Sequence, residues 1–190
     1  MKKFFLFVWE IVKVAVISLA IIIPVRYYLI QPFYVKGASM EPNFHDNEYL
    51  IIDELSYRFN EPVRGQVIVF RYPRNPQEYF IKRLIALPGE ELQIKNGKII
   101  IYNDEYPEGL ILSESYLDEY LLTDSSTDGK IAIGPDEYFV MGDNRSSSRD
   151  SRSFGPVNKN FITGKVLFRG WPLSNLSFFG KDSWPNYENQ

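Results

Sequence analysis

Ser39 is the first residue of this sequence whose surroundings suggest chemistry. It stands in the run Gly-Ala-Ser-Met-Glu-Pro at 37–42, and a serine hydroxyl becomes a nucleophile once a nearby group takes its proton. His45 is the only histidine, and it lies six residues from Ser39, too near in sequence to face it easily. The hydrolase elbow Gly-x-Ser-x-Gly fails because Glu41 fills its last position, and no Ser-x-x-Lys occurs. A lysine from elsewhere in the chain is the base that remains.

Lys82 has the setting that such a base needs. It lies in Tyr-Phe-Ile-Lys-Arg-Leu-Ile at 79–85, which we predict to be a β-strand with Phe80, Lys82 and Leu84 on one face. A free lysine with its pKa of ~10.4 is protonated at neutral pH, but desolvation among apolar neighbours lowers that pKa. We therefore expect Lys82 to be the base for Ser39. The alternative is an ordinary strand whose lysine extends into solvent.

A third stretch, Gly-Asp-Asn-Arg-Ser-Ser-Ser-Arg-Asp-Ser-Arg at 142–152, is dense in charges and hydroxyls. Taken alone, each of the three stretches has an ordinary structural interpretation. The first could be a loop closing on proline, the second a strand running into the turn at Pro88 and Gly89, and the third a polar surface loop. Their significance lies in their combination.

Composition excludes several functions. The net charge of −3 and the lack of a Lys/Arg-rich run argue against nucleic-acid binding. The absence of cysteine excludes disulfides, thiolate catalysis and zinc fingers. Carboxylates alone are left to bind a metal, and the acidic run 124–129 lacks the residue order of a calcium loop, so we interpret it as a solvated turn. We expect neither a metal nor a cofactor.

The first thirty residues predict a membrane anchor. Residues 4–23 are mostly apolar, and their only charged residues are Glu10 and Lys13, which lie three apart on a helix and can pair. Twenty helical residues at ~1.5 Å each span the ~30 Å hydrocarbon layer. The alternatives are a buried core helix and a cleaved secretory signal, for which Ser18 and Ala20 offer one small-x-small pair. The N-terminal lysines favour a cytoplasmic N-terminus, although cations on the other flank weaken that bias.

After the anchor, period-two patterns predict a mostly β fold. The strand candidates are 49–53, 66–71, 78–85, 137–141 and 164–169. Asn96-Gly97 between 92–95 and 98–102 predicts a hairpin with a type I′ turn. Residues 96–131 are more polar and irregular, which suggests a small insertion. We thus expect an anchor at 1–30, a β core at 31–95 and 132–178, an insertion at 96–131, and a tail at 179–190 that does not cross the membrane.

The three stretches, in this order behind an anchor, resemble the motif boxes of bacterial type I signal peptidases, over most of residues 31–170. The resemblance implies an anchored enzyme of antiparallel β-sheets with a small β insertion, in which Ser39 is the nucleophile, Lys82 the base, and Ser148 a hydrogen-bond partner of the lysine. It makes the Ser39 N–H one oxyanion donor. In many Gram-negative members a serine two positions before the nucleophile is the second oxyanion donor. This chain has Gly37 there, as Gram-positive-like members do, so the resemblance does not identify the second oxyanion donor. Four charged residues would hold the 142–152 loop through ion pairs and hydrogen bonds: Asp143, Arg145, Asp150 and Arg152.

The same resemblance describes the substrate and the location. The family cuts exported preproteins, bound as an extended strand with small residues at the first and third positions before the cut, on the outer face of the cytoplasmic membrane. The residues matching its shallow pockets are Val35, Met40, Phe44, Phe80 and Ile81. An apolar surface resting on the lipid bilayer is expected from Phe33, Tyr34, Trp171, Phe178 and Phe179, for which a plain core role is the alternative. Glu90 stands where many members have aspartate.

Two rival functions remain at this point. A self-cleaving repressor-type peptidase shares the Ser-Lys chemistry but needs a DNA-binding helical domain, where this chain is apolar instead. A membrane-tethered β-domain that binds a partner without chemistry would not need Ser39. Loss or retention of function in Ser39→Ala separates the enzymes from the binding module.

Overall fold

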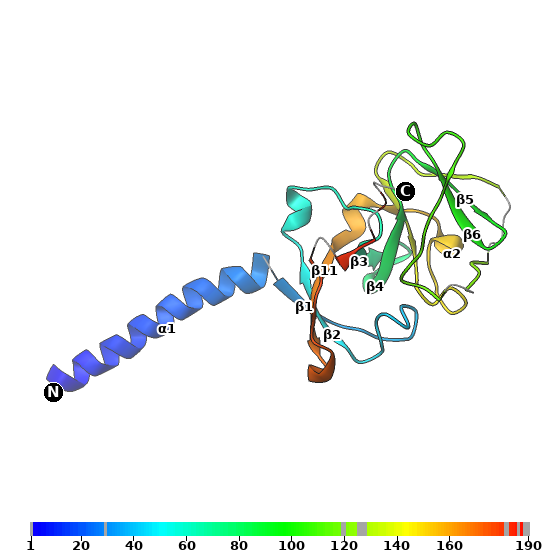
Figure 1. Ribbon diagram of the computed structural model, residues 1–190. Helices are drawn as coiled ribbons and strands as arrows, with labels where there is room; N and C mark the ends of the chain where they lie inside the picture. Colours follow the sequence, from blue (N-terminus) through cyan, green and yellow to red (C-terminus); the bar gives the residue numbers. More distant parts are fainter. Residues whose placement is uncertain are drawn as a thin grey trace.

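The computed structural model describes residues 2–28, 30–118, 121–124, 129–180, 183–185 and 187, with the side chains of 24–28 and 30 excepted. A long helix, α1 (Lys2–Tyr28), projects from a β domain (Figure 1). Within the described chain it is the one helix long and apolar enough to cross a membrane, over Lys2–Ile23, and none of that segment is buried in the protein. The side chains of Glu10 and Lys13 pair on it at 2.7 Å. A helix with this exposed apolar surface is not a core helix, which removes that alternative.

The larger sheet has the strand order β1-β2-β11-β3-β4-β9-β10, and β12 also pairs with β11. All its pairings are antiparallel, so the predicted mostly β, antiparallel fold is confirmed. The strands are β1 (Ile30–Tyr34), β2 (Tyr49–Asp53), β3 (Val67–Tyr72), β4 (Asn75–Ala86), β9 (Glu137–Met141), β10 (Val157–Asn158), β11 (Ile162–Trp171) and β12 (Ser177–Phe178). Short helices lie at η1 (Ser56–Arg58), α2 (Ser151–Phe154), η2 (Lys159–Phe161) and η3 (Leu173–Asn175).

A smaller sheet of four strands packs beside the larger one, in the order β7-β6-β5-β8. Its strands are β5 (Glu91–Lys95), β6 (Lys98–Tyr102), β7 (Leu110–Ile111) and β8 (Ile131–Ala132). The predicted hairpin is present: β5 and β6 pair up to Lys95 opposite Lys98, and Asn96 and Gly97 both have the positive φ values of a type I′ turn. The sheet includes β5, so it begins before residue 96, and the division of the chain into core and insertion stays a prediction.

Three apolar clusters form the core. One fills the space between the two sheets with residues such as Ile85, Leu92 and Phe139, and it includes Tyr187 from the C-terminal tail. Another, containing Met40, Phe44 and Val69, lies under the first half of the large sheet. The third lies under β3, β4 and β9.

The described part of the tail packs against the domain. Trp184 stacks on Phe179 with ring centroids 5.5 Å apart, and Tyr187 is buried. Residues 179–190 were predicted only as a tail without an apolar run, and scattered aromatics in such a segment give no periodic signal of packing.

Glu90 ties the two sheets together. Its carboxylate forms a buried ion pair with Arg64 at 2.6 Å and accepts hydrogen bonds from the Leu87 N–H at 2.8 Å and the Asn103 Nδ2 at 2.9 Å. Asn103 follows β6 of the small sheet, whereas Arg64 precedes β3 of the large one. The glutamate side chain thus bridges elements from both sheets.

We predict that Glu90→Ala lowers the free energy of unfolding by about 3–5 kcal/mol, because it leaves the Arg64 guanidinium buried without its anion. Urea denaturation measures the loss. The matched control is Glu91→Ala, whose carboxylate pairs with Lys130 near the surface and whose removal should cost no more than about 1 kcal/mol. Equal losses in the two variants would refute the bridging role of Glu90.

Candidate active site

Ser39 and Lys82 meet in the structure although 43 residues separate them. Lys82 lies in the middle of β4, opposite Ile68 of β3, and Ser39 lies in the turns between β1 and β2. The Lys82 Nζ is 2.7 Å from the Ser39 Oγ and 2.8 Å from the Ile81 carbonyl oxygen. At that distance a protonated amine donates to the serine oxygen, while a neutral amine can accept the hydroxyl proton. The pair therefore has the geometry of a nucleophile and its base.

Burial favours the neutral form of the Lys82 amine. Lys82 is 3% exposed, and desolvation lowers the pKa of its amine to about 8, against the opposing attraction of Asp150 and Asp143. The ring of Phe80, on the same strand face, lies 5.3 Å from the Nζ. The predicted strand face and the predicted direction of the pKa shift thus agree with the structure.

His45 takes no part in this arrangement. Its side chain is about half exposed, and its Nδ1 lies 3.8 Å from Glu41. Since Lys82 occupies the position beside Ser39, the geometry favours the lysine over the histidine as the base.

The 142–152 loop holds the backbone of the nucleophile. The Asn144 N–H donates to the Ser39 carbonyl oxygen at 3.1 Å, and the Asn144 Nδ2 donates to the Ala38 carbonyl oxygen at 3.1 Å. Gly142 is required at this contact, because a Cβ there would lie 2.4 Å from the Ser39 carbonyl oxygen. The loop and the nucleophile segment are therefore in direct backbone contact.

Three buried ion pairs surround the loop, and two of them have a partner outside it. Asp150 pairs with Arg152 within the loop at 2.8 Å. Asp143 instead pairs with Arg83 of β4, through bonds of 2.8 and 2.6 Å, and Arg145 pairs with Glu114, in the connection between β7 and β8. Sequence reasoning missed Arg83 and Glu114, because nothing local marks a residue that pairs across such a separation. Their only signal was that each is charged and sits in an apolar or irregular stretch.

Two predicted supporting residues lie near Ser39 without the contacts expected of them. The Ser148 Oγ is buried and forms no hydrogen bond of ordinary geometry in the described structure, so the expected bond to Lys82 is not made. It is close enough to Asp150 to help lower the pKa of that carboxyl, after Arg152 and the Gly142 N–H. Gly37 has a φ of 88°, and its N–H donates to Asp46 at 2.7 Å. No second oxyanion donor is identified by these contacts.

A groove of about 530 Å³ opens in front of Ser39 and Lys82. It runs between two strand edges: β1 pairs on one side only, with β2, and the first half of β4 pairs only with β3, because β9 joins β4 from Arg83 onward. The aromatic rings of Phe33 and Tyr79 meet across it at 5.2 Å. Two backbone edges with a gap between them can accept one extended strand.

The groove contains only some of the predicted pocket residues. Val35, Phe80 and Ile81 line it, together with Leu50 and Val69, which sequence reasoning did not single out. Met40 and Phe44 do not line it; each is 1% exposed in the core cluster beneath. Charged side chains border it as well, namely Lys36, Glu78 and Arg149.

Comparison with known proteins gives a consistent result. The family model described as signal peptidase, peptidase S26, matches residues 8–171. The chain is 34% identical to a signal peptidase I of Leptolyngbya laminosa, over 90% of this chain and 83% of the relative, and 34% identical to one of Bacillus amyloliquefaciens, over 86% and 88%. A crystal structure of a signal peptidase I from Enterococcus faecalis aligns at 31% identity with 56% of this chain and 97% of its own, with a TM-score of 0.46. The relatives thus include Gram-positive enzymes, as expected.

Proposed function

Because this chain belongs to the signal peptidase family, peptidase S26, and its helix α1 is long and apolar enough to cross a membrane, we propose that it is a membrane-anchored enzyme that removes signal peptides from exported preproteins, with Ser39 as nucleophile and Lys82 as general base. The observation that carries the assignment of the two residues is the 2.7 Å contact between the Lys82 Nζ and the Ser39 Oγ. With its pKa lowered to about 8, the Lys82 amine is unprotonated in enough of the molecules near neutral pH to serve as a general base.

The reaction follows from this contact. Neutral Lys82 takes the hydroxyl proton as the Ser39 Oγ attacks the scissile carbonyl, and the resulting oxyanion faces the Ser39 N–H. The lysine ammonium then gives its proton to the departing amine of the mature protein, which leaves the signal peptide as an ester on Ser39. A water molecule, deprotonated in turn by Lys82, hydrolyses that ester and restores the hydroxyl.

We predict that Lys82→Ala and Lys82→Arg both lower kcat roughly 10²–10⁴-fold, since a guanidinium stays protonated and cannot serve as the base. Ser39→Ala should abolish cleavage, and His45→Ala should retain most of it. The wild-type rate should rise with pH through a group of pKa about 8, because only the neutral amine accepts a proton. The measurement is cleavage of a preprotein by detergent-solubilised protein, with sequencing of the new N-terminus. An active Lys82→Ala beside an inactive, folded His45→Ala would overturn the mechanism.

The substrate fits the groove as an added strand. Its backbone can pair with the free edges of β1 and β4, and its side chains then alternate between the groove floor and solvent. Val35, Leu50 and Val69 form apolar walls in front of the nucleophile, which leaves room for small side chains at alternate positions. This geometry supports the expected small residues at the first and third positions before the cut.

We predict that replacing alanine by phenylalanine at the first position before the cut of a model preprotein abolishes processing. The same change at the second position, whose side chain points away from the floor, should be tolerated within about tenfold. Mass spectrometry of the products gives both rates. Undiminished cleavage at the first position would reject the assignment of the pocket.

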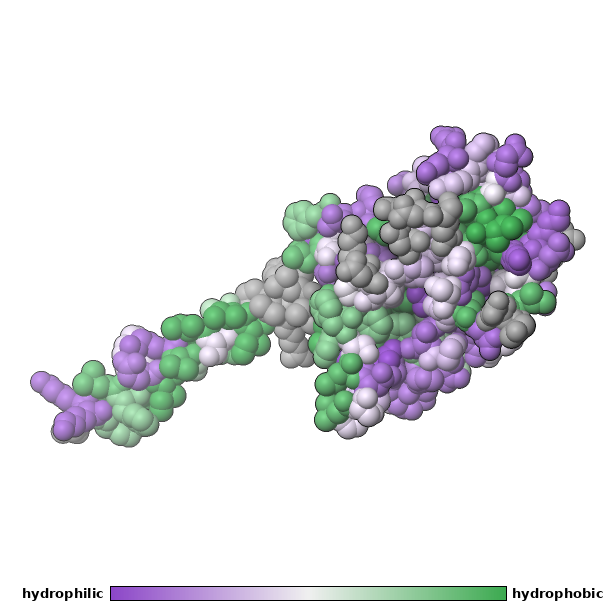
Figure 2. Space-filling view, viewed as in Figure 1, coloured by the Kyte–Doolittle hydropathy of each residue, from purple (hydrophilic) through white to green (hydrophobic). Residues whose placement is uncertain are grey.

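An apolar face of the domain supports contact with the bilayer. Figure 2 shows apolar side chains on the side from which α1 leaves the domain. The exposed large side chains of β1, β2 and the segment 171–178 are Tyr34, Tyr49, Trp171, Leu173, Leu176 and Phe178. Two residues expected on this surface have other contacts: Phe33 is half-buried against Tyr79, and Phe179 packs inward on Phe44 at 5.2 Å. A face of this kind beside an anchor would keep the groove at the membrane surface.

We predict that the β domain lies outside the cytoplasmic membrane and the N-terminus inside, because the substrates are exported chains. Protease added to intact spheroplasts should digest residues beyond about 30, while a cytoplasmic marker protein stays intact as the control. If the domain is degraded only after lysis, the orientation is the reverse.

A further inference from the structure

Glu114 lies outside the catalytic loop, yet it supplies the anion for one of the loop's arginines. The Arg145 Nη1 donates to the Glu114 Oε2 at 3.0 Å, and the Nη2 donates to the Oε1. The side chain of Arg145 is 1% exposed and that of Glu114 is 14% exposed. Thr123, further along the same connection, accepts another hydrogen bond from the Nη1 at 2.5 Å, and the Nε donates to the Gly142 carbonyl oxygen at 3.0 Å. The guanidinium therefore joins the connection to the start of the loop.

Tyr116 reaches the other side of the same loop. Its hydroxyl donates to Glu114 at 2.6 Å, and its ring lies 3.8 Å from the guanidinium carbon of Arg83, the partner of Asp143. The Tyr116 carbonyl oxygen accepts from the Asn43 Nδ2 at 2.8 Å, and that amide also donates to Asp143 at 2.9 Å. One short segment, Glu114 to Tyr116, thus contacts two arginines at the loop: Arg145 within it, and Arg83, which binds Asp143 from β4.

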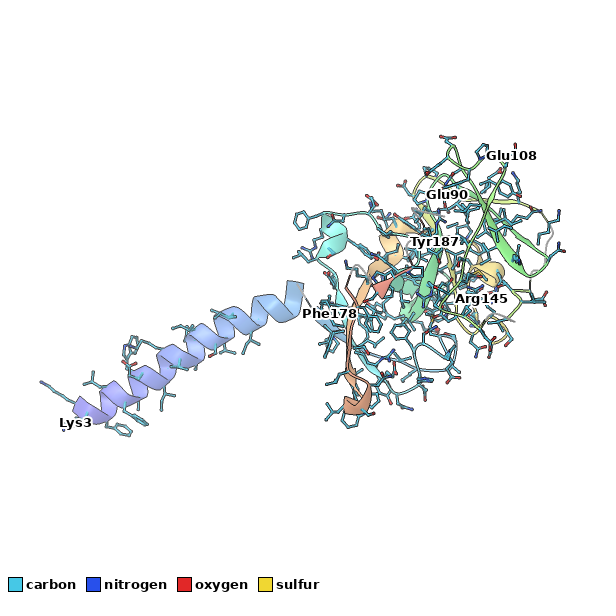
Figure 3. The ribbon with its side chains drawn as sticks, viewed as in Figure 1. Lys3, Glu90, Glu108, Arg145, Phe178 and Tyr187 are labelled. Atoms are coloured by element: carbon cyan, nitrogen blue, oxygen red, sulfur yellow. The ribbon has the colours of Figure 1, made fainter. Side chains whose placement is uncertain are left out.

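These contacts converge on the nucleophile. Between Asp143 and Arg145 lies Asn144, whose N–H donates to the Ser39 carbonyl oxygen. Residues 142–145 are therefore held from one side by Glu114 and Tyr116 and hold Ser39 on the other. None of Glu114, Tyr116, Thr123 and Arg145 lines the substrate groove. Figure 3 shows Arg145 within the body of the domain and Glu108 at the tip of the small sheet, well away from it.

We propose that Glu114 and Tyr116 are positioning residues for the reaction, which fix loop 142–145 and, through it, the Ser39 hydroxyl in front of Lys82. The inference rests on the proposed role of Ser39 as nucleophile. It assigns the connection between β7 and β8 a part in catalysis rather than in substrate binding. A nucleophile displaced by a fraction of an ångström loses rate steeply, because attack requires a near-attack geometry.

The first test is Glu114→Gln in the full chain, solubilised in detergent, with a peptide that carries alanine at the first and third positions before the cut. We expect kcat to fall about tenfold, the effect of ~1.4 kcal/mol on the barrier, and KM to stay within about twofold. The pH midpoint of kcat should also rise, because a loosened loop admits water to Lys82 and relieves its desolvation. The carboxylates facing Lys82, Asp143 and Asp150, keep their own arginines in this variant. A loss of folded protein alone would move neither the pH midpoint nor KM.

The matched control is Glu108→Gln, an exposed glutamate in the turn between β6 and β7, which should keep wild-type kcat, KM and pH midpoint. The double variant Glu114→Gln, Arg145→Met removes both charges, so it folds without an unpaired buried cation. It should remain as slow as the single variant, because loop 142–145 has lost its attachment.

A wild-type rate and pH midpoint in the double variant would overturn the inference, since the pair would then serve only to neutralise each other. A Glu114→Gln protein with unchanged kcat would overturn it as well. If the wild-type protein cleaves no signal-peptide substrate, the proposed function fails instead, and the two failures are distinguishable by that control.

Discussion

The constraint on which the active site depends is a lysine amine that must be buried and yet mostly unpaired. Lys82 is 3% exposed, and its nearest partners are a hydroxyl and a carbonyl oxygen, not a carboxylate. A carboxylate bonded directly to the amine would hold it protonated. Asp143 and Asp150 are near enough to raise its pKa, but each is bonded to an arginine, Arg83 and Arg152. These ion pairs let the desolvation of Lys82 dominate.

The fold supplies that environment through a sheet that is closed behind the amine and open in front of it. Lys82 lies where β4 changes neighbours, since β9 joins the strand at the next residue, Arg83. On the buried side, Arg83 pairs with Asp143 and so holds the catalytic loop. On the open side, the free edges of β1 and β4 border the groove. The same strand thus carries the base, supports the loop that holds the nucleophile, and offers an edge to the substrate. The connection between β7 and β8 contributes to this through Glu114, which binds Arg145 of the loop.

Sequence reasoning succeeded where the determinants are local. The period-two pattern around Lys82, the Asn96-Gly97 turn and the apolar N-terminal helix are each set by neighbouring residues, and the structure has all three. It failed where pairing is long-range. Arg145 was expected to help hold the loop, but its partner was not predicted, and the carboxylate that it binds comes from Glu114, 31 residues away. Met40 and Phe44 matched pocket positions in the resemblance but are core residues here. Both lie in turns, where the sequence has no periodic pattern that would separate side chains facing the core from side chains facing the groove.

The most direct test of this account is an NMR titration of the Lys82 amine in the full chain, with ¹³C-labelled lysine and with Lys82→Met to assign the signal. Burial beside Ser39 predicts a midpoint of about 8. A midpoint near ~10.4, the value of a free lysine, would mean that the amine is solvated or paired with a carboxylate, and it would contradict the assignment of Lys82 as the general base.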